Sequence, residues 1–87
     1  HVWPASAQRG PDGAIAIGGV PLPAVAAAHG TPLYVIDEAD ARARAARTRA
    51  AFTAAAERHG SSAAVYYASK AFLCGEVARW MVDAGLN

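Results

Sequence analysis

The 87-residue sequence has little sulfur, little charge and no long apolar run. Its single cysteine, Cys74, excludes an internal disulfide and a cysteine-based metal site, and fits a reducing compartment. A net charge of +1, with 17% charged residues, lacks the basic excess of a nucleic-acid-binding module. No apolar stretch approaches the roughly 20 residues that cross a bilayer, and no signal-peptide pattern is present. We therefore expect a cytoplasmic protein without nucleic-acid or membrane partners.

Large apolar side chains are also scarce. The hydrophobic content is 54%, but 24 of these residues are alanine, which favours helices and buries little area. A chain of this length makes at most one small domain with a marginal core. The sequence starts at His1 rather than methionine and stops at Asn87, where a βα pattern breaks off without partner strands. We interpret the chain as a fragment of a larger protein.

Residues 1–30 form the first of two expected segments. The stretch 1–13 has two prolines, two glycines and no sustained period, and therefore predicts a loop. Alternating apolar residues predict an edge strand at 14–20. Pro23 suits the first turn of a short helix that ends at His29, with Gly30 as its cap.

Residues 31–87 alternate between strand and helix patterns. The expected elements are a strand, a long Ala/Arg helix, an apolar strand and a last helix, at 33–36, 38–59, 63–69 and 75–84. Asp37 lies at the N-cap position of the long helix. On the last helix, Val77 and Met81 are an apolar i,i+4 pair. This order predicts an α/β architecture with a parallel sheet.

Lys70 is the residue most suggestive of chemistry. It is the only lysine, whereas the other seven basic residues, histidine aside, are arginine. Arginine cannot replace lysine in imine chemistry, because guanidinium stays protonated. A lysine held among apolar groups at a strand end would have a lowered pKa and an available neutral amine. The alternative is an exposed lysine that ends a strand and plays no chemical role.

Side-chain alternation along the expected strand predicts which residues lie on the same face as Lys70. In a regular strand, Tyr66, Ala68 and Lys70 share one face, and Val65 and Tyr67 share the other. If Lys70 points into a barrel, the small Ala68 below it leaves room for a flat cofactor ring. We therefore count Ala68 as a cofactor-binding candidate beside Lys70.

The run YASKA at 67–71 resembles the cofactor-lysine motif of the fold-type-III pyridoxal-phosphate enzymes, the alanine-racemase-like barrels. Together with GTPLYVID at 30–37 and the helix between them, it is most similar to the diaminopimelate decarboxylases. Phe72 departs from the family pattern, in which an asparagine often follows the Lys-Ala pair. The alanine-racemase continuation after the lysine is absent. The resemblance covers nearly the whole chain, from Trp3 to Asn87.

This resemblance implies an N-terminal piece of a decarboxylase that converts meso-2,6-diaminopimelate into L-lysine and CO2. Lys70 would bind pyridoxal 5'-phosphate covalently and is the implied catalytic residue, and no metal is implied. Residues 31–87 would begin a (β/α)8 barrel, and residues 1–30 would join a separate β-domain. The partners would be a diamino-acid substrate and a second subunit in a homodimer. The fragment alone would be inactive, because such a barrel needs about 250 residues.

Two other functions stay open at this point. A decarboxylase of ornithine, arginine or a related diamino acid would share the lysine motif. A non-enzymatic module could use the Ala/Arg helix for interaction, although the arginines at 42, 44, 47 and 49 favour a solvated face. For Cys74 we expect no catalytic role, and His29 and His59 fit helix-end capping.

Overall fold

The computed structural model describes residues 3–87, which form two compact units, His1–Asp40 and Ala41–Asn87. Its strands and helices follow one another in the order β1 Gln8–Arg9, β2 Ile15–Ile17, β3 Val20–Pro21, α1 Leu22–His29, α2 Glu38–Arg58 and α3 Gly75–Asp83. The three strands form one antiparallel sheet in the order β1-β2-β3. No helix within residues 3–87 combines the length and the apolar character needed to cross a membrane.

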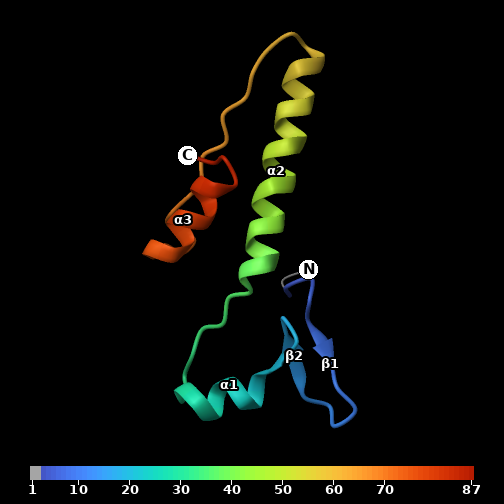
Figure 1. The fold of residues 1–87 in the computed structure, drawn as a ribbon, viewed down its shortest axis with the longest axis vertical. Helices are drawn as coiled ribbons and strands as arrows, with labels where there is room; N and C mark the ends of the chain where they lie inside the picture. Colours follow the sequence, from blue (N-terminus) through green and yellow to red (C-terminus); the bar gives the residue numbers. More distant parts are fainter. Residues whose placement is uncertain (1–2) are drawn as a thin grey trace. The chain divides into compact units, whose positions relative to one another are not determined.

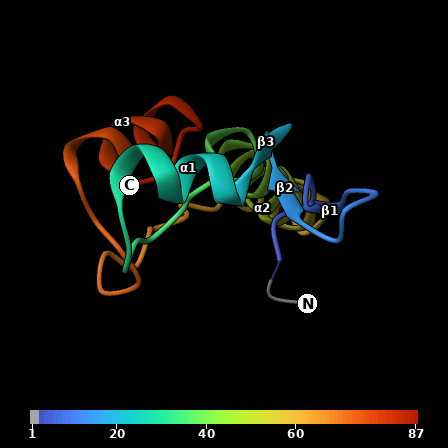
Figure 2. The same cartoon turned by 90° about the horizontal axis from the view of Figure 1, so that it is seen from below.

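A tight hairpin replaces the single edge strand expected at 14–20. Gly18 and Gly19 both have positive φ angles, 59° and 80°, so the chain reverses between β2 and β3. Two glycines are well suited to this reversal, because they adopt the left-handed region without steric cost. In the register, Ile17 pairs with Val20. Figure 2 shows β2 and β3 side by side, with α1 directly after them.

Helix α1 begins and ends as the sequence predicts. Pro23 lies in its first turn, where the missing N–H costs nothing. At the other end, Gly30 adopts a φ of 79° and its N–H donates to the carbonyl of Ala26. The segment 33–36 that follows is not a strand, contrary to the prediction. Its apolar sequence favours extended backbone, but a strand also needs a hydrogen-bonded neighbour, which it lacks here.

The long helix α2 confirms the prediction to within one residue. Its first turn is capped by Asp37, whose Oδ1 accepts a hydrogen bond from the backbone N–H of Asp40 at 3.1 Å. Gly60, two residues beyond its end, has a φ of 68°. Local propensity and capping are sufficient to define this helix, because its 21 residues contain no glycine or proline.

The core of the described residues lies in the second unit. Its four buried side chains are 4–8% exposed and come from α2, α3 and the end of the chain: Ala45, Val77, Met81 and Leu86. Half-buried side chains pack around them, namely Val65, Tyr67, Trp80 and Ala84. Figure 1 shows α3 alongside α2, with the chain returning to the pair at its C-terminal end. The predicted i,i+4 pair of Val77 and Met81 is therefore confirmed as the buried face of α3.

The segment 63–69 is not a strand either, but it makes the first contact of a parallel pair. The N–H of Asn87 donates to the carbonyl of Val65 at 2.8 Å, and the N–H of Tyr67 donates to the carbonyl of Asn87 at 2.7 Å. Two such bonds that flank Tyr66 follow the slanted pattern of parallel strands. Helix α3 lies between the paired segments in sequence. The hydrogen bonds have a parallel pattern, but the parallel sheet predicted from the sequence order does not form among the described residues, whose three strands are antiparallel.

Candidate functional site

Lys70 lies in a tight turn at the end of the extended segment. The N–H of Ala71 donates to the carbonyl of Ala68 at 3.0 Å, which makes Ser69 and Lys70 the two central residues of the turn. Lys70 is exposed. The apolar surroundings expected from the sequence are therefore absent in this chain, because a single extended segment cannot enclose a side chain at its end.

The predicted alternation of faces holds only as far as the turn. Val65 and Tyr67 pack against the core, whereas Tyr66 is 75% exposed and Ala68 is also exposed on the opposite face. Lys70 was expected to continue the face of Ala68. It does not continue a regular strand, because the backbone turns at Ser69 and Lys70. The structure thus places Ala68 at the start of the turn and Lys70 at one of its two central positions.

Tyr67 adds a second hydrogen bond to this turn, which sequence reasoning missed. Its hydroxyl donates to the backbone carbonyl of Phe72 at 2.5 Å, across the loop that carries Lys70. The sequence contains no signal for this contact, because it depends on the chain reversing direction after Ala68. Together, the two bonds define the conformation of the loop on both sides of the lysine.

Two arginines of α2 hold the end of α3. Arg42 forms an ion pair with Asp83, with 3.1 Å between Nη1 and Oδ2, and its guanidinium lies over the Trp80 ring, 5.8 Å from the centroid. One heptad later, the Nε of Arg49 donates to the carbonyl of Gly85 at 3.2 Å. Arg42 is half-buried and Arg49 is exposed, so the predicted solvated face is retained and also makes these contacts to the end of α3. Their i,i+7 spacing was a usable signal, because it places both on one side of the helix.

A polar cluster forms in the first unit around Asp37. The hydroxyl of Ser6 donates to Asp37 Oδ2 and accepts a hydrogen bond from the N–H of Gly18 at 2.7 Å. The hydrogen bond from Ser6, followed by that from the N–H of Asp40, lowers the pKa of the Asp37 carboxyl below its ordinary value of 3.8. This cluster joins the β2–β3 turn, the N-terminal segment and the first turn of α2. Its groups are all engaged in these structural bonds.

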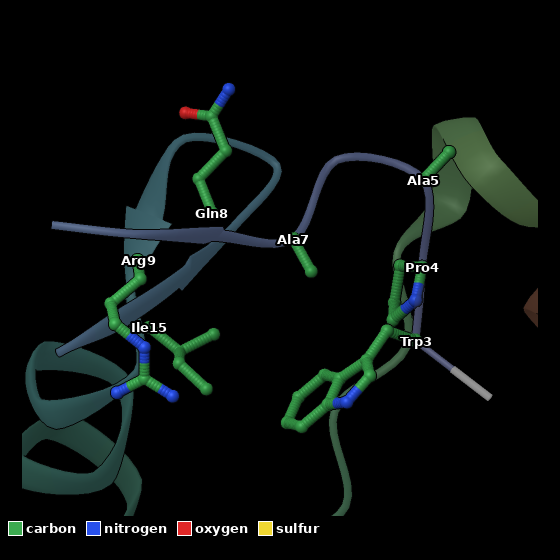
Figure 3. Close-up of a pocket in the computed structure, with 7 residues that line it drawn as sticks. All are labelled: Trp3, Pro4, Ala5, Ala7, Gln8, Arg9 and Ile15. Carbon is green, nitrogen blue, oxygen red and sulfur yellow. The ribbon is translucent and has the colours of Figure 1, made fainter. Parts of the chain in front are cut away.

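Described residues of the first unit line open hollows. One, of about 330 Å³, is lined by Trp3, Pro4, Ala5, Ala7, Gln8, Arg9 and Ile15 (Figure 3). Arg9 and Gln8 project to opposite sides of β1 in this view, and Arg9 Nη1 donates to the carbonyl of Gly13 at 2.8 Å. The other, of about 270 Å³, is mostly apolar and lies between β2, α1 and the residues before α2. Neither hollow contains a nucleophile next to a base.

Cys74 occupies the N-cap position of α3 and is exposed. No side-chain hydrogen bond caps the helix there, and Glu76 in the first turn pairs with Arg79 at 2.9 Å. Among residues 3–87, no three histidine, cysteine, aspartate or glutamate side chains converge on a common point. Within this chain, the candidate site therefore consists of the Lys70 turn and the residues that hold it.

The chain is similar to bacterial proteins named diaminopimelate decarboxylase. It is 50% identical over 86 residues to the diaminopimelate decarboxylase of Mycobacterium tuberculosis (strain H37Rv), which covers 99% of this chain and 18% of the relative. It is 48% identical over 87 residues to the diaminopimelate decarboxylase of Corynebacterium efficiens, and 36% identical over 87 residues to that of a Synechocystis species. These two matches cover the whole chain, and 17% and 18% of the relatives. No protein-family model matches the chain.

The chain is a homologue of the N-terminal part of the diaminopimelate decarboxylases. It spans about 18% of the length of the curated relatives it matches. The resemblance stated from the motifs at 30–37 and 67–71 is thereby confirmed.

Proposed function

We propose that this chain is the N-terminal part of an enzyme that decarboxylates meso-2,6-diaminopimelate to L-lysine and CO2 with pyridoxal 5'-phosphate. The observation that carries the proposal is the 50% identity over nearly the whole chain to an enzyme of that name. The isolated lysine of an otherwise arginine-based sequence supports it, because only an amine can bind an aldehyde cofactor covalently.

The residues around Lys70 fit such a cofactor. Lys70 is exposed at a central position of its turn, and Ala68, the first residue of that turn, is also exposed and has a small side chain. Lys70 would hold the cofactor through its amine, and Ala68 would leave room for the ring. When bound, pyridoxal phosphate supplies the electron sink for loss of the carboxylate. The residues of this chain would fix the position of the cofactor and of the Lys70 amine.

The backbone around Val65–Tyr67 supports a barrel for the complete enzyme. One face of this segment packs against the helices, and the other face, with Tyr66 and Ala68, is open. A (β/α)8 barrel has this arrangement, with helices outside and the second face of each strand directed inward. The parallel hydrogen bonds to Asn87 fit the same architecture. Residues 31–87 would begin the barrel, and residues 1–30 would contribute their strands to a β-domain.

We propose a cytoplasmic homodimer that takes a small diamino acid as its substrate. The exposed Cys74 is compatible with a reducing compartment. Gel filtration of the full-length protein would test the dimer, with a monomer as the contradicting result.

The decisive experiment labels the lysine in the full-length protein. After incubation with pyridoxal phosphate and reduction with borohydride, peptide mass spectrometry should find a pyridoxyl group on the peptide that contains Lys70. A Lys70→Ala variant should lose both the label and CO2 release, while Arg79→Ala, at an exposed site on α3, should keep both. An unlabelled Lys70 in a protein without cofactor absorbance would contradict the proposal.

Substrate choice is tested separately by CO2 release. The full-length enzyme should act on meso-diaminopimelate in preference to ornithine and arginine. A reversed preference with an intact label on Lys70 would leave the cofactor role standing and replace the substrate. The remaining alternative, a helical interaction module, has less support, because Arg42 and Arg49 of α2 bind α3 within this chain.

A further inference from the structure

We propose that Tyr67 is a positioning residue for Lys70, which acts by holding the carbonyl of Phe72 and thereby the loop that presents the lysine. The proposal rests on the proposed function, since it gives Tyr67 a purpose only if Lys70 is the reactive amine. Tyr67 itself touches neither cofactor nor substrate in this interpretation.

The loop from Ala68 to Cys74 has few restraints of its own. Within it, the backbone bond from Ala71 to Ala68 closes one turn, and the next backbone bond is that from the N–H of Ala78 to the carbonyl of Cys74, at the start of α3. Among the described residues, the loop receives one side-chain hydrogen bond, which the hydroxyl of Tyr67 donates to the carbonyl of Phe72. At 2.5 Å it lies at the short end of the range for O–H···O bonds.

Tyr67 is itself anchored at two other points. Its ring packs against the core cluster that Val77 and Met81 of α3 help to form. Its backbone N–H donates to the carbonyl of Asn87 in the parallel pairing. The hydroxyl therefore connects the most firmly packed part of the unit to an exposed loop. Without it, the position of Lys70 would depend on the Ala68–Ala71 turn alone.

Tyr66 offers a matched control. It is the adjacent residue, it has the same side chain, and it lies on the opposite, open face with 75% of its surface exposed. No hydrogen bond of its hydroxyl is present among residues 3–87. Tyr66→Phe and Tyr67→Phe thus remove the same oxygen atom from neighbouring positions. Only the second change removes a bond to the lysine loop.

The expected effect is on catalysis more than on stability. The Phe72 carbonyl lies in an exposed segment, so water replaces the lost hydroxyl at small cost. Misplacement of a reacting group by about 1 Å can lower a rate by about 100-fold. A loop that samples several positions should therefore lower kcat for diaminopimelate by about tenfold, with KM changed by less than about threefold, because Tyr67 does not contact the substrate.

The first measurement uses the cofactor-free full-length protein. Amide hydrogen exchange in peptides that cover 68–74 should be at least about threefold faster in Tyr67→Phe than in wild type or in Tyr66→Phe. Exchange in α2 should be the same in all three proteins. This readout does not require that Lys70 bind any cofactor, and so it remains informative if the proposed function fails.

The second measurement follows activity and the absorbance of the bound cofactor at saturating pyridoxal phosphate. Tyr67→Phe should lower kcat and slow formation of the cofactor–lysine band, while Arg79→Ala, at an exposed site on α3, should match wild type. Normal kcat in Tyr67→Phe, or faster exchange spread across α2 and α3 instead of confined to 68–74, would overturn the positioning role. Absence of a label on Lys70 in wild type would overturn the proposed function instead, and the two failures are therefore distinguishable.

Discussion

Each of the two units of this chain is stabilised internally by a different kind of interaction. All four buried apolar side chains of the described residues lie in Ala41–Asn87, whereas within Trp3–Asp40 no side chain is fully buried. The first unit relies on a short antiparallel sheet and on the hydrogen bonds of Ser6 and Asp37. Composition explains the contrast, because the first unit has all five prolines and five of the eight glycines. Turn-rich sequence favours local polar bonds, and an apolar i,i+4 face favours a core.

The contrast also bears on the chemistry, because the candidate lysine lies in the unit that contains the core. Lys70 lies in the second unit, on a loop attached to the core through Tyr67. The first unit has a polar cluster whose groups bind one another. We therefore expect changes in the second unit to alter local unfolding and activity together. Changes in the first unit should act on local structure alone.

The largest effect is expected at Met81, in the core of the second unit. Met81→Ala should lower the free energy of local opening of 75–87 by about 2–5 kcal/mol, because it leaves a cavity beneath α3. Native-state hydrogen exchange on the full-length protein would measure this. The control is Val82→Ala on the same helix, where the side chain is 68% exposed and the expected change is below about 0.5 kcal/mol. Equal effects at both positions would contradict the assignment of the core face.

A smaller effect is expected where α3 ends. Gly85 has a φ of 83°, so Gly85→Ala adds backbone strain. The new Cβ would also lie 2.5 Å from Arg49 Nε and would displace the Arg49 side chain from the Gly85 carbonyl to which it donates. We expect a loss of about 1–3 kcal/mol in the same exchange measurement.

Gly60→Ala provides the matched control for Gly85. Its φ of 68° imposes similar backbone strain, but no atom lies within 4 Å of an added Cβ. The difference between the two variants isolates the Arg49 contact. If Gly60→Ala were as costly as Gly85→Ala, Arg49 would contribute nothing measurable to the second unit.

The smallest effect is expected in the first unit, as a dependence on pH. The pKa of Asp37 is lowered in the folded state, so its contribution to stability is present above the ordinary value of 3.8 and is lost as the pH falls through the folded value. Digestion by pepsin between pH 5 and pH 2 should show wild type more resistant than Asp37→Asn at pH 5. The ratio of their cleavage rates within 3–40 should approach one at pH 2.

The ratio cancels the pH dependence of the protease itself. Ser6→Ala should reduce the wild-type advantage, because the Ser6 hydroxyl is the main cause of the lowered pKa. A ratio that stays constant from pH 5 to pH 2 would show that the charge of Asp37 does not stabilise the unit.

Local sequence signals were sufficient for the helices. Alanine-rich composition, the Asp37 cap and the glycines after each helix predicted α1, α2 and α3 to within one residue at nearly every end. The hairpin was missed, although Gly18-Gly19 is a strong turn signal, because the apolar alternation was extended across it. The strands expected at 33–36 and 63–69 did not form, because among the described residues 33–36 has no hydrogen-bonded neighbour strand and 63–69 pairs with the single residue Asn87.

The sequence by itself determined the helices, the buried face of α3 and the choice of Lys70 as the reactive candidate. These follow from backbone propensity, apolar periodicity and the chemistry of a single amine, all of which act over a few residues. Only the tertiary structure decided that Tyr67 binds the Phe72 carbonyl, that Arg42 and Arg49 hold the end of α3, and that Asn87 pairs with the segment before Lys70. Those contacts join residues whose approach depends on how the whole unit packs, and no local pattern specifies them.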